Sequence, residues 1–153
     1  MPNSFSQLHV HVVMAPHYRQ ALIDPSWSED LHRYLTGILH GAGGKMIRVN
    51  SMPDHLHALM GLRPSIRPSD LMRDLKSDAS KWVNDHQLCP KTFRWQEGYG
   101  MFAVGKRELD RVTEYIIGQQ VHHQKRSFLE EYRELLEEEG IDFDDRYLFY
   151  EPV

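Results

Sequence analysis

Residues 45–62 read KMIRVNSMPDHLHALMGL. Two short apolar runs, Lys45 to Met52 and His55 to Leu62, flank the pair Pro53-Asp54. Proline fixes its own φ and aspartate offers a side-chain acceptor, so this pair favours a tight connection between antiparallel strands. The stretch therefore predicts a β-hairpin.

The sequence on either side of this hairpin alternates between strand-like and helix-like segments. Residues 5–14, FSQLHVHVVM, are rich in aromatic and β-branched residues and stop at Ala15-Pro16, which predicts a strand. Helical spacing of apolar residues, helix-starting residues and glycine or proline breaks predict the other elements. These are a helix over 27–39, a helix from 68 to the Cys89-Pro90 linker, a strand over 93–104 that is irregular around Gly98 and Gly100, and helices over 106–124 and 127–140.

The order strand, helix, strand, strand, helix, strand predicts the fold class. It is the split βαβ arrangement of ferredoxin-like α+β folds, in which helices cover an antiparallel sheet. The length of 153 residues and the apolar content of 41% suit a single domain over 1–153. Because this fold hosts many unrelated functions, the function has to be inferred from a site.

Charge is distributed unevenly along the chain. The net charge is -4, yet residues 125–153 alone carry 4 Lys and Arg against 10 Asp and Glu, and the remainder carries 14 against 12. We interpret 126–153 as an acidic, helical C-terminal extension that caps the domain, with Phe128, Leu135 and Leu136 packed inward. The main body can still present a basic face to phosphate.

The sequence also indicates the cellular setting. The one cysteine, Cys89, cannot form an internal disulfide, and the first thirty residues lack the features of a signal peptide. No run of eighteen apolar residues occurs anywhere in the chain. We therefore expect a cytoplasmic protein with no membrane partner.

Two histidine pairs of the form His-x-His are candidate metal ligands. His55 and His57 lie on the second hairpin strand, where alternate side chains share a face, so both imidazoles can reach one divalent ion. The alternative is a polar strand face that happens to hold two histidines. His9 and His11 repeat the spacing on the first strand without an obvious third ligand, and one of them is alternatively a hydrogen-bonded core histidine.

A polar stripe runs along the helix predicted before the last one. Tyr115 and Gln119 are four residues apart and share a face, with His123 a further turn along. A solvated helix face is the ordinary explanation for such a stripe. Combined with the histidine pair it suggests chemistry, since an ion held by His55, His57 and a glutamine oxygen could polarise a phosphodiester for attack by the tyrosine hydroxyl.

These residues resemble the motifs of a known family. Pro53 through His57 is similar to the HUH motif (His, bulky hydrophobic, His) of the single-tyrosine transposases of bacterial insertion sequences, the TnpA group that moves single-stranded DNA. Tyr115 through Gln119 resembles the motif of that family's catalytic helix. Further matches, which extend the resemblance over roughly residues 5 to 148, are Trp95-Gln96-Glu97-Gly98-Tyr99-Gly100, His122-His123, and Val12-Val13 with Pro16, Tyr18 and Arg19.

The resemblance implies a role for each matching residue. Tyr115 is expected to be the nucleophile, and His55, His57 and Gln119 to bind Mg²⁺ or Mn²⁺, with no small-molecule cofactor. The implied activity is cleavage and rejoining of single-stranded DNA at hairpin-bearing element ends, through a 5′-phosphotyrosine intermediate that leaves a free 3′-hydroxyl. The resemblance also implies a homodimer in a bacterial or archaeal cytoplasm, in which the tyrosine helix of one subunit can complete the HUH site of the other.

Basic and aromatic residues outside the main motifs are candidate DNA contacts. Arg73 and Lys76 are three residues apart on the second predicted helix and could contact successive phosphates. Trp95 could stack on an unpaired base, and Arg19 is a further candidate near the end of the first strand. A solvated charged face and a core tryptophan are the ordinary alternatives.

Two positions depart from the family pattern. His17 stands where members often have lysine, which affects a phosphate contact, and Gly118 stands where asparagine commonly precedes the glutamine. The glycine is expected to loosen the helix by up to about 1 kcal/mol relative to a good helix former. Two other functions stay open at this point: a domesticated, repeat-associated relative that processes genomic palindromes, and a metal-binding ferredoxin-like module without nuclease activity.

Overall fold

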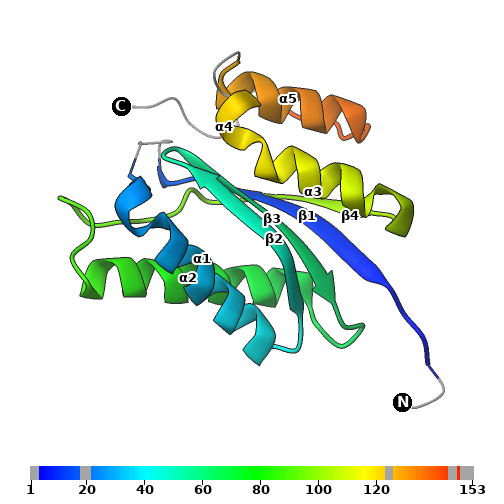
Figure 1. The fold of residues 1–153 in the computed structure, drawn as a ribbon, viewed down its shortest axis with the longest axis horizontal. Coiled ribbons are helices and arrows are strands. Elements are labelled where there is room, and N and C mark those ends of the chain that lie inside the picture. Colours follow the sequence, from blue (N-terminus) through cyan, green and yellow to red (C-terminus); the bar gives the residue numbers. More distant parts are fainter. Residues whose placement is uncertain (1–3, 18–21, 123–125, 145–147, 149–153) are drawn as a thin grey trace.

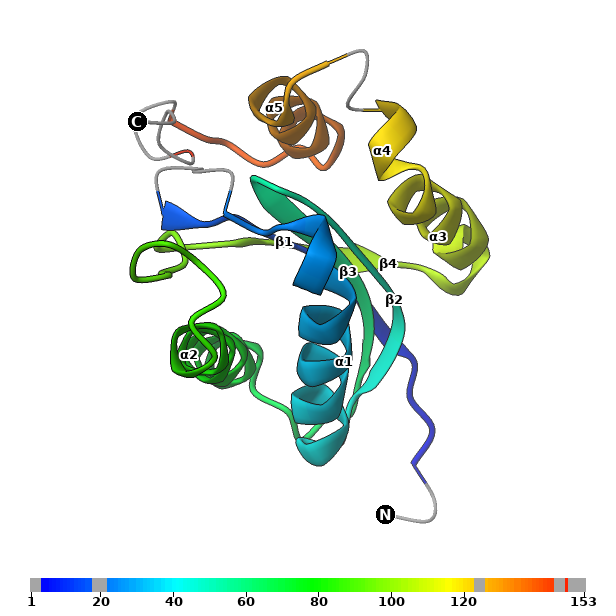
Figure 2. The same ribbon diagram turned by 60° about the vertical axis from the view of Figure 1, so that its left-hand side comes forward.

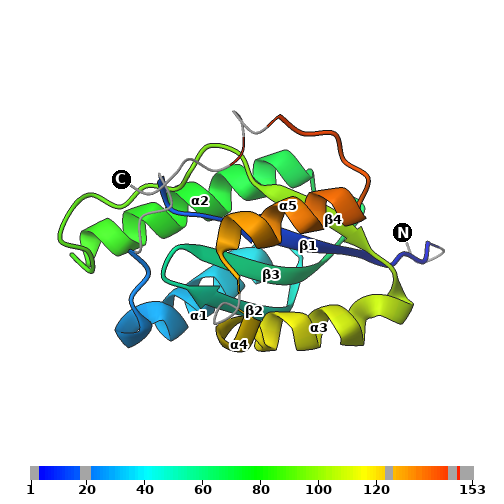
Figure 3. The ribbon, with the colours of Figure 1, turned by 90° about the horizontal axis from the view of Figure 1, so that it is seen from above.

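The architecture is one antiparallel sheet with helices on both faces, seen in a computed structural model that describes residues 4–17, 22–122, 126–144 and 148 (Figure 1). Along the sheet the strand order is β2 (Lys45–Met52), β3 (His55–Leu62), β1 (Leu8–Met14) and β4 (Gly100–Val104). Helices α1 (Pro25–Gly41) and α2 (Pro68–Asp85) cover one face (Figure 2). The opposite face carries α3 (Leu109–Ile117), α4 (Gln119–His122) and α5 (Phe128–Glu138) (Figure 3). The predicted ferredoxin-like α+β fold is confirmed.

The main core lies between the sheet and the first two helices. Each of these helices begins with proline, which is favoured in the first helical turn, and Asp24 caps α1 by accepting a 2.8 Å hydrogen bond from the Ser26 amide. The buried helix residues recur every three to four positions and pack on alternate strand residues. From the strands, the core receives Val12, Met14, Leu56, Ala58 and Met60.

The opposite face of the sheet holds two smaller clusters. Phe128, Tyr132 and Leu136 of α5 pack on the end of β1 and on Phe102 of β4, while α3 packs on Leu59 of β3. Phe128 and Leu136 are buried and Leu135 is half-buried, as predicted for the acidic extension. None of the helices in the described ranges has the length and apolar content that crossing a bilayer requires.

The predicted hairpin is present. Strands β2 and β3 pair antiparallel across the turn at Pro53 and Asp54, with Met52 opposite His55 and Asn50 opposite His57. The first strand is shorter than predicted. It begins at Leu8, whereas Phe5, the first residue of the predicted strand, is 95% exposed.

The strand predicted over 93–104 is regular only from Gly100 onward. Side chains of α2 satisfy the backbone of the preceding segment: Asn84 hydrogen-bonds both the amide and the carbonyl of Phe93, and Lys76 Nζ donates to Gln96 O at 2.6 Å. Because side chains bond these backbone groups, the groups need no neighbouring strand. The segment runs as a loop with one isolated β-bridge between Pro16 and Trp95.

The helix predicted over 106–124 is broken into three pieces. Residues 106–108 form a 3-10 turn, α3 follows, and Gly118 separates α3 from α4. Asn50 of β2 donates a 2.8 Å hydrogen bond to the Ile116 carbonyl, which ties the end of α3 to the sheet. A glycine with low helix propensity beside this anchored carbonyl is the physical reason for the break.

Candidate active site

The hairpin places two histidines side by side on the inner surface of the α3–α5 face. Along β3 the residues Leu56, Ala58 and Met60 enter the main core, so the alternate residues His55 and His57 project to the other side. Both imidazoles are fully buried, and their ring centroids are 5.2 Å apart. The histidine pair is therefore an interior feature rather than a solvated strand face.

The tyrosine helix reaches this histidine pair within the same chain. Gln119, the first residue of α4, is fully buried and its Oε1 lies 2.9 Å from His55 Nε2. Tyr115, in the last turn of α3, is half-buried, and its ring centroid lies 5.7 Å from that of His57. The structure thus brings together four residues that sequence motifs had singled out from two distant segments.

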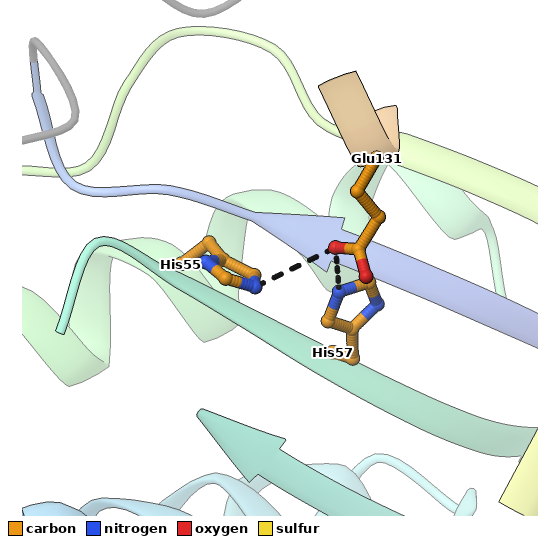
Figure 4. Close-up of side chains that lie close together, drawn as sticks. All are labelled: His55, His57 and Glu131. Carbon is orange, nitrogen blue, oxygen red and sulfur yellow. Dashed lines mark hydrogen bonds and ion pairs between the residues drawn. The ribbon is translucent and has the colours of Figure 1, made fainter. Parts of the chain in front are cut away.

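Glu131 of α5 lies at the centre of the cluster and was missed by the sequence analysis (Figure 4). Its Oε1 lies 3.0 Å from His57 Nε2 and 3.6 Å from His55 Nε2. Its Oε2 accepts hydrogen bonds from the Tyr115 hydroxyl and, at 3.1 Å, from Gln119 Nε2. A signal was present in the sequence, because residue 131 falls on the otherwise apolar stripe of α5.

The outward-facing nitrogens of the two histidines also have partners. His57 Nδ1 lies 2.8 Å from His11 Nε2, and His55 Nδ1 lies 2.7 Å from Asp54 Oδ1. Burial and the nearby His57 lower the pKa of His11 to about 3, so His11 is neutral and its Nε2 can accept a hydrogen bond from His57 Nδ1. Such partners orient metal-binding imidazoles, and here both Nε2 atoms face Glu131 Oε1, the position from which they would bind a shared ion.

His11 is therefore the hydrogen-bonded core histidine that one reading of the His9 and His11 pair predicted. His9 is outside the group of nearby ligand atoms that the described residues form, which consists of His55, His57 and Glu131. The ligand atoms of these three residues all lie within 4.8 Å of one another. With Gln119 Oε1 beside His55, the donors are two imidazole nitrogens and two oxygens.

This donor set fits a divalent metal ion. Imidazole nitrogens and carboxylate or amide oxygens are both common ligands of divalent ions in proteins, so the mixed set is chemically suited to one. The carboxylate of Glu131 is fully buried, and a buried negative charge is costly unless a positive charge or strong hydrogen bonds compensate it. A cation held between Glu131, His55 and His57 would provide that compensation.

The local charges act directly on the tyrosine. Burial and the negative charge of Glu131 raise the pKa of Tyr115 above its ordinary value, so the hydroxyl stays protonated and donates to the carboxylate. A small cavity of about 130 Å³ borders this side chain and is also lined by Arg111 and Arg126. The Arg126 guanidinium lies 4.0 Å from Glu131 Oε2, which places positive charge near the hydroxyl.

The predicted DNA contacts that belong to the described residues lie apart from this cluster. Arg73 is exposed on α2 and pairs with Asp70 and Asp74, whereas Lys76 is half-buried and donates to the loop carbonyls. Trp95 is only 7% exposed and packs edge-on against another core ring, so in this arrangement it offers no free face for base stacking. Arg19 and His123 lie outside the described residues.

Comparison with known proteins supports this fold and identifies the family of the chain. The family model described as "Transposase IS200 like" matches residues 4–119, which contain both histidines, the tyrosine and the glutamine. The chain belongs to this family of IS200-like transposases. The matched range ends before α5, so Glu131 lies beyond it.

The individual proteins that this chain resembles are also described as transposases. The ISDra2 transposase TnpA of Deinococcus radiodurans is 25% identical over 118 residues, which cover 74% of this chain and 84% of that protein. A crystal structure described as that of a transposase from the same species has a TM-score of 0.61 at 22% identity and covers 76% of this chain and 94% of its own. The structure of a REP-associated tyrosine transposase bound to a REP hairpin has a TM-score of 0.61 at 14% identity, with coverage of 79% and 72%. At such identities the two structures support the fold alone.

Proposed function

We propose that this chain cleaves and rejoins single-stranded DNA at hairpin-bearing ends of an insertion sequence, with Tyr115 as the nucleophile. The observation that carries the proposal is the position of the Tyr115 hydroxyl, which hydrogen-bonds the same carboxylate that faces His55 Nε2 and His57 Nε2. A nucleophile and a ligand set for a divalent ion therefore meet at one buried point. Membership of the IS200-like transposase family supports DNA as the substrate.

Four residues would hold the metal ion in this proposal. They are His55 and His57 through Nε2, Gln119 through Oε1 and Glu131 through its carboxylate. A bound Mg²⁺ or Mn²⁺ would polarise the scissile phosphate and stabilise the charge that develops on it. Asp54 and His11 would keep the two imidazoles oriented.

The chain's own residues account for the covalent step. The Tyr115 oxygen attacks the phosphorus, a new O–P bond forms, and the bond to the 3′-oxygen of the upstream strand breaks, while the proton that Tyr115 loses is balanced by the one that the leaving 3′-oxygen takes up. The upstream strand leaves with a free 3′-hydroxyl, and the downstream 5′-phosphate stays on Tyr115. Because one phosphate ester replaces another, a 3′-hydroxyl can reverse the step and rejoin DNA without an external energy source.

The DNA partner and the assembly are part of the same proposal. A structural neighbour of 14% identity is bound to a REP hairpin, which supports a hairpin-bearing single strand as the partner here. Arg73, with Lys76 and Arg19, is proposed to contact its phosphates. A homodimer would hold two DNA ends at once in the cytoplasm, although the tyrosine and the histidines already meet within one chain.

The decisive experiment is a covalent-adduct assay. Purified protein is incubated with 5′- or 3′-labelled single-stranded oligonucleotides that cover the flanks of its own gene, with Mn²⁺ or with EDTA, and separated on a denaturing protein gel. We expect a Mn²⁺-dependent adduct that carries the downstream fragment and is absent from Tyr115→Phe and His57→Ala. An adduct that persists in Tyr115→Phe would remove Tyr115 as the nucleophile, and intact DNA with wild-type protein would contradict the proposed reaction.

A further inference from the structure

We propose that Glu131 is the positioning residue through which α5 holds the Tyr115 hydroxyl against the metal ligands of its own chain. This inference rests on the proposed function for its catalytic consequence, but the positioning itself can be measured without DNA or metal. In this inference the acidic C-terminal helix contributes a residue to the active site as well as capping the domain.

The first argument is the way the two carboxylate oxygens divide their contacts. Oε1 faces the imidazole nitrogens of His57 and His55, at 3.0 and 3.6 Å. Oε2 accepts from the Tyr115 hydroxyl and from Gln119 Nε2. One rigid, planar group thus joins the β3 histidines to both functional side chains of the tyrosine helix, and it fixes the hydroxyl relative to the histidines.

The second argument is the unfavourable energetics of the position. Residue 131 is fully buried in a stripe whose other members, Phe128, Tyr132 and Leu136, form an apolar cluster with the sheet. Burial of a charged group is costly even when it is paired, and an apolar residue of similar volume is often equally or more stable at such positions. Packing alone therefore gives no reason for glutamate here, whereas orientation of Tyr115 does.

The third argument is that Glu131 is itself held in place. Ser127 caps α5 by accepting a 3.3 Å hydrogen bond from the Glu130 amide, which fixes the start of the helix. One turn before Glu131, Phe128 stacks on His55 with ring centroids 4.2 Å apart. The backbone of the tyrosine helix is anchored separately by Asn50. The remaining freedom is that of the Tyr115 side chain, and Glu131 restrains its end.

The direct test observes Tyr115 in metal-free protein. 3-Fluorotyrosine is incorporated at position 115 alone, and the ¹⁹F NMR spectrum is recorded for wild type, Glu131→Gln, Glu131→Ala and the control Glu137→Gln. Glu137 lies on the same helix and is exposed, so its variant matches the charge change without touching the site. We expect a shifted and narrower resonance in Glu131→Ala, a smaller change in Glu131→Gln, and the wild-type signal in Glu137→Gln. An unchanged signal in both Glu131 variants that fold by circular dichroism would overturn the inference.

The second readout separates positioning of Tyr115 from DNA binding, and because Glu131 is also a proposed metal ligand it uses Mn²⁺ concentrations that saturate each variant. Single-turnover rates of adduct formation are measured at saturating oligonucleotide and Mn²⁺, and the Kd for the hairpin is measured in parallel. Because misplacement of a reacting group costs rate rather than affinity, we expect Glu131→Ala to lose at least about tenfold in rate with a Kd within about twofold of wild type. An unchanged or faster rate would overturn the inference. If wild type forms no adduct at all, the proposed function fails, and the ¹⁹F result alone decides whether Glu131 positions Tyr115.

Discussion

Gly100, the first residue of β4, lies against α5, and a larger residue at this position is expected to disturb the histidine site. A Cβ atom here would lie 2.9 Å from Tyr132 Cε1 and 3.1 Å from Phe102 Cζ, closer than ordinary van der Waals contact. Gly100→Ala therefore forces the Tyr132 ring to move. Tyr132 stacks on Phe128, which stacks on His55, so the displacement is passed along three rings to the site.

The expected magnitude combines two opposing effects. Overpacking a tightly packed core costs about 1–3 kcal/mol. Alanine also restricts the unfolded chain more than glycine does, which offsets roughly 0.4–1 kcal/mol of that cost. Since Tyr132 is only 6% exposed, its ring has little solvent space to move into. We expect the free energy of unfolding to fall by about 1–2 kcal/mol.

Urea unfolding followed by circular dichroism measures this change, and calorimetric titration with Mn²⁺ reports the consequence for the site. Gly37→Ala is the matched control, because a Cβ at Gly37 in α1 would meet nothing within 4 Å. This control should be more stable than wild type by about 0.5–1 kcal/mol, since alanine is the better helix former. If Gly100→Ala is as stable as wild type and binds Mn²⁺ equally well, the reasoning about tight packing between β4 and α5 is refuted.

Three further outcomes follow from the site and its surroundings. His11→Phe removes the partner of His57 Nδ1 and should weaken Mn²⁺ binding by about tenfold in calorimetry, and unchanged affinity would contradict the orienting role of His11. Mn²⁺ at a hundred times its Kd should raise the free energy of unfolding by about 2.7 kcal/mol, reversibly with EDTA, and a melting temperature insensitive to Mn²⁺ would contradict a metal site. Burial lowers the pKa of His32 in the folded protein. As the pH falls through about 6.5, His32 is therefore protonated in the unfolded chain before it is protonated in the folded one. Its contribution makes the free energy of unfolding decrease as the pH falls from 7 to 5. His32→Gln should show a shallower decline in urea unfolding, and an identical slope would exclude His32 as a contributor.

Local periodicity explains how much of the fold the sequence analysis recovered. Alternation along residues 55–62 and the Pro53-Asp54 turn were sufficient to predict the hairpin and the face shared by His55 and His57. Helical spacing likewise put Tyr115 and Gln119 on one side of the predicted helix, and both face the histidines although the structure divides that helix into α3 and α4. The segment before Gly100, predicted as part of an irregular strand, runs as a loop, because side chains of α2 bond part of its backbone and no local pattern reveals them.

Long-range contacts were the part that local patterns could not supply. Trp95 fits a stacking residue in the sequence, yet the core encloses it. Glu131 was read as one acid among ten in the last 29 residues, although it alone of the described ones is fully buried and faces the histidines. Whether a charged side chain is solvated or buried depends on what the rest of the chain places over it.

The sequence by itself determined the order of elements, the faces on which the histidines and the tyrosine lie, and the family motifs, because these depend on spacing within single segments. Only the tertiary structure decided that the two motifs meet within one chain, that His11 and Glu131 join them, and that the cluster is buried. The contacts that involve His57 and His55 join residues 46 to 74 positions apart, and the contact between Tyr115 and Glu131 joins residues 16 positions apart. Their geometry is set by how α3, α4 and α5 pack on the sheet, which spacing along the chain does not encode.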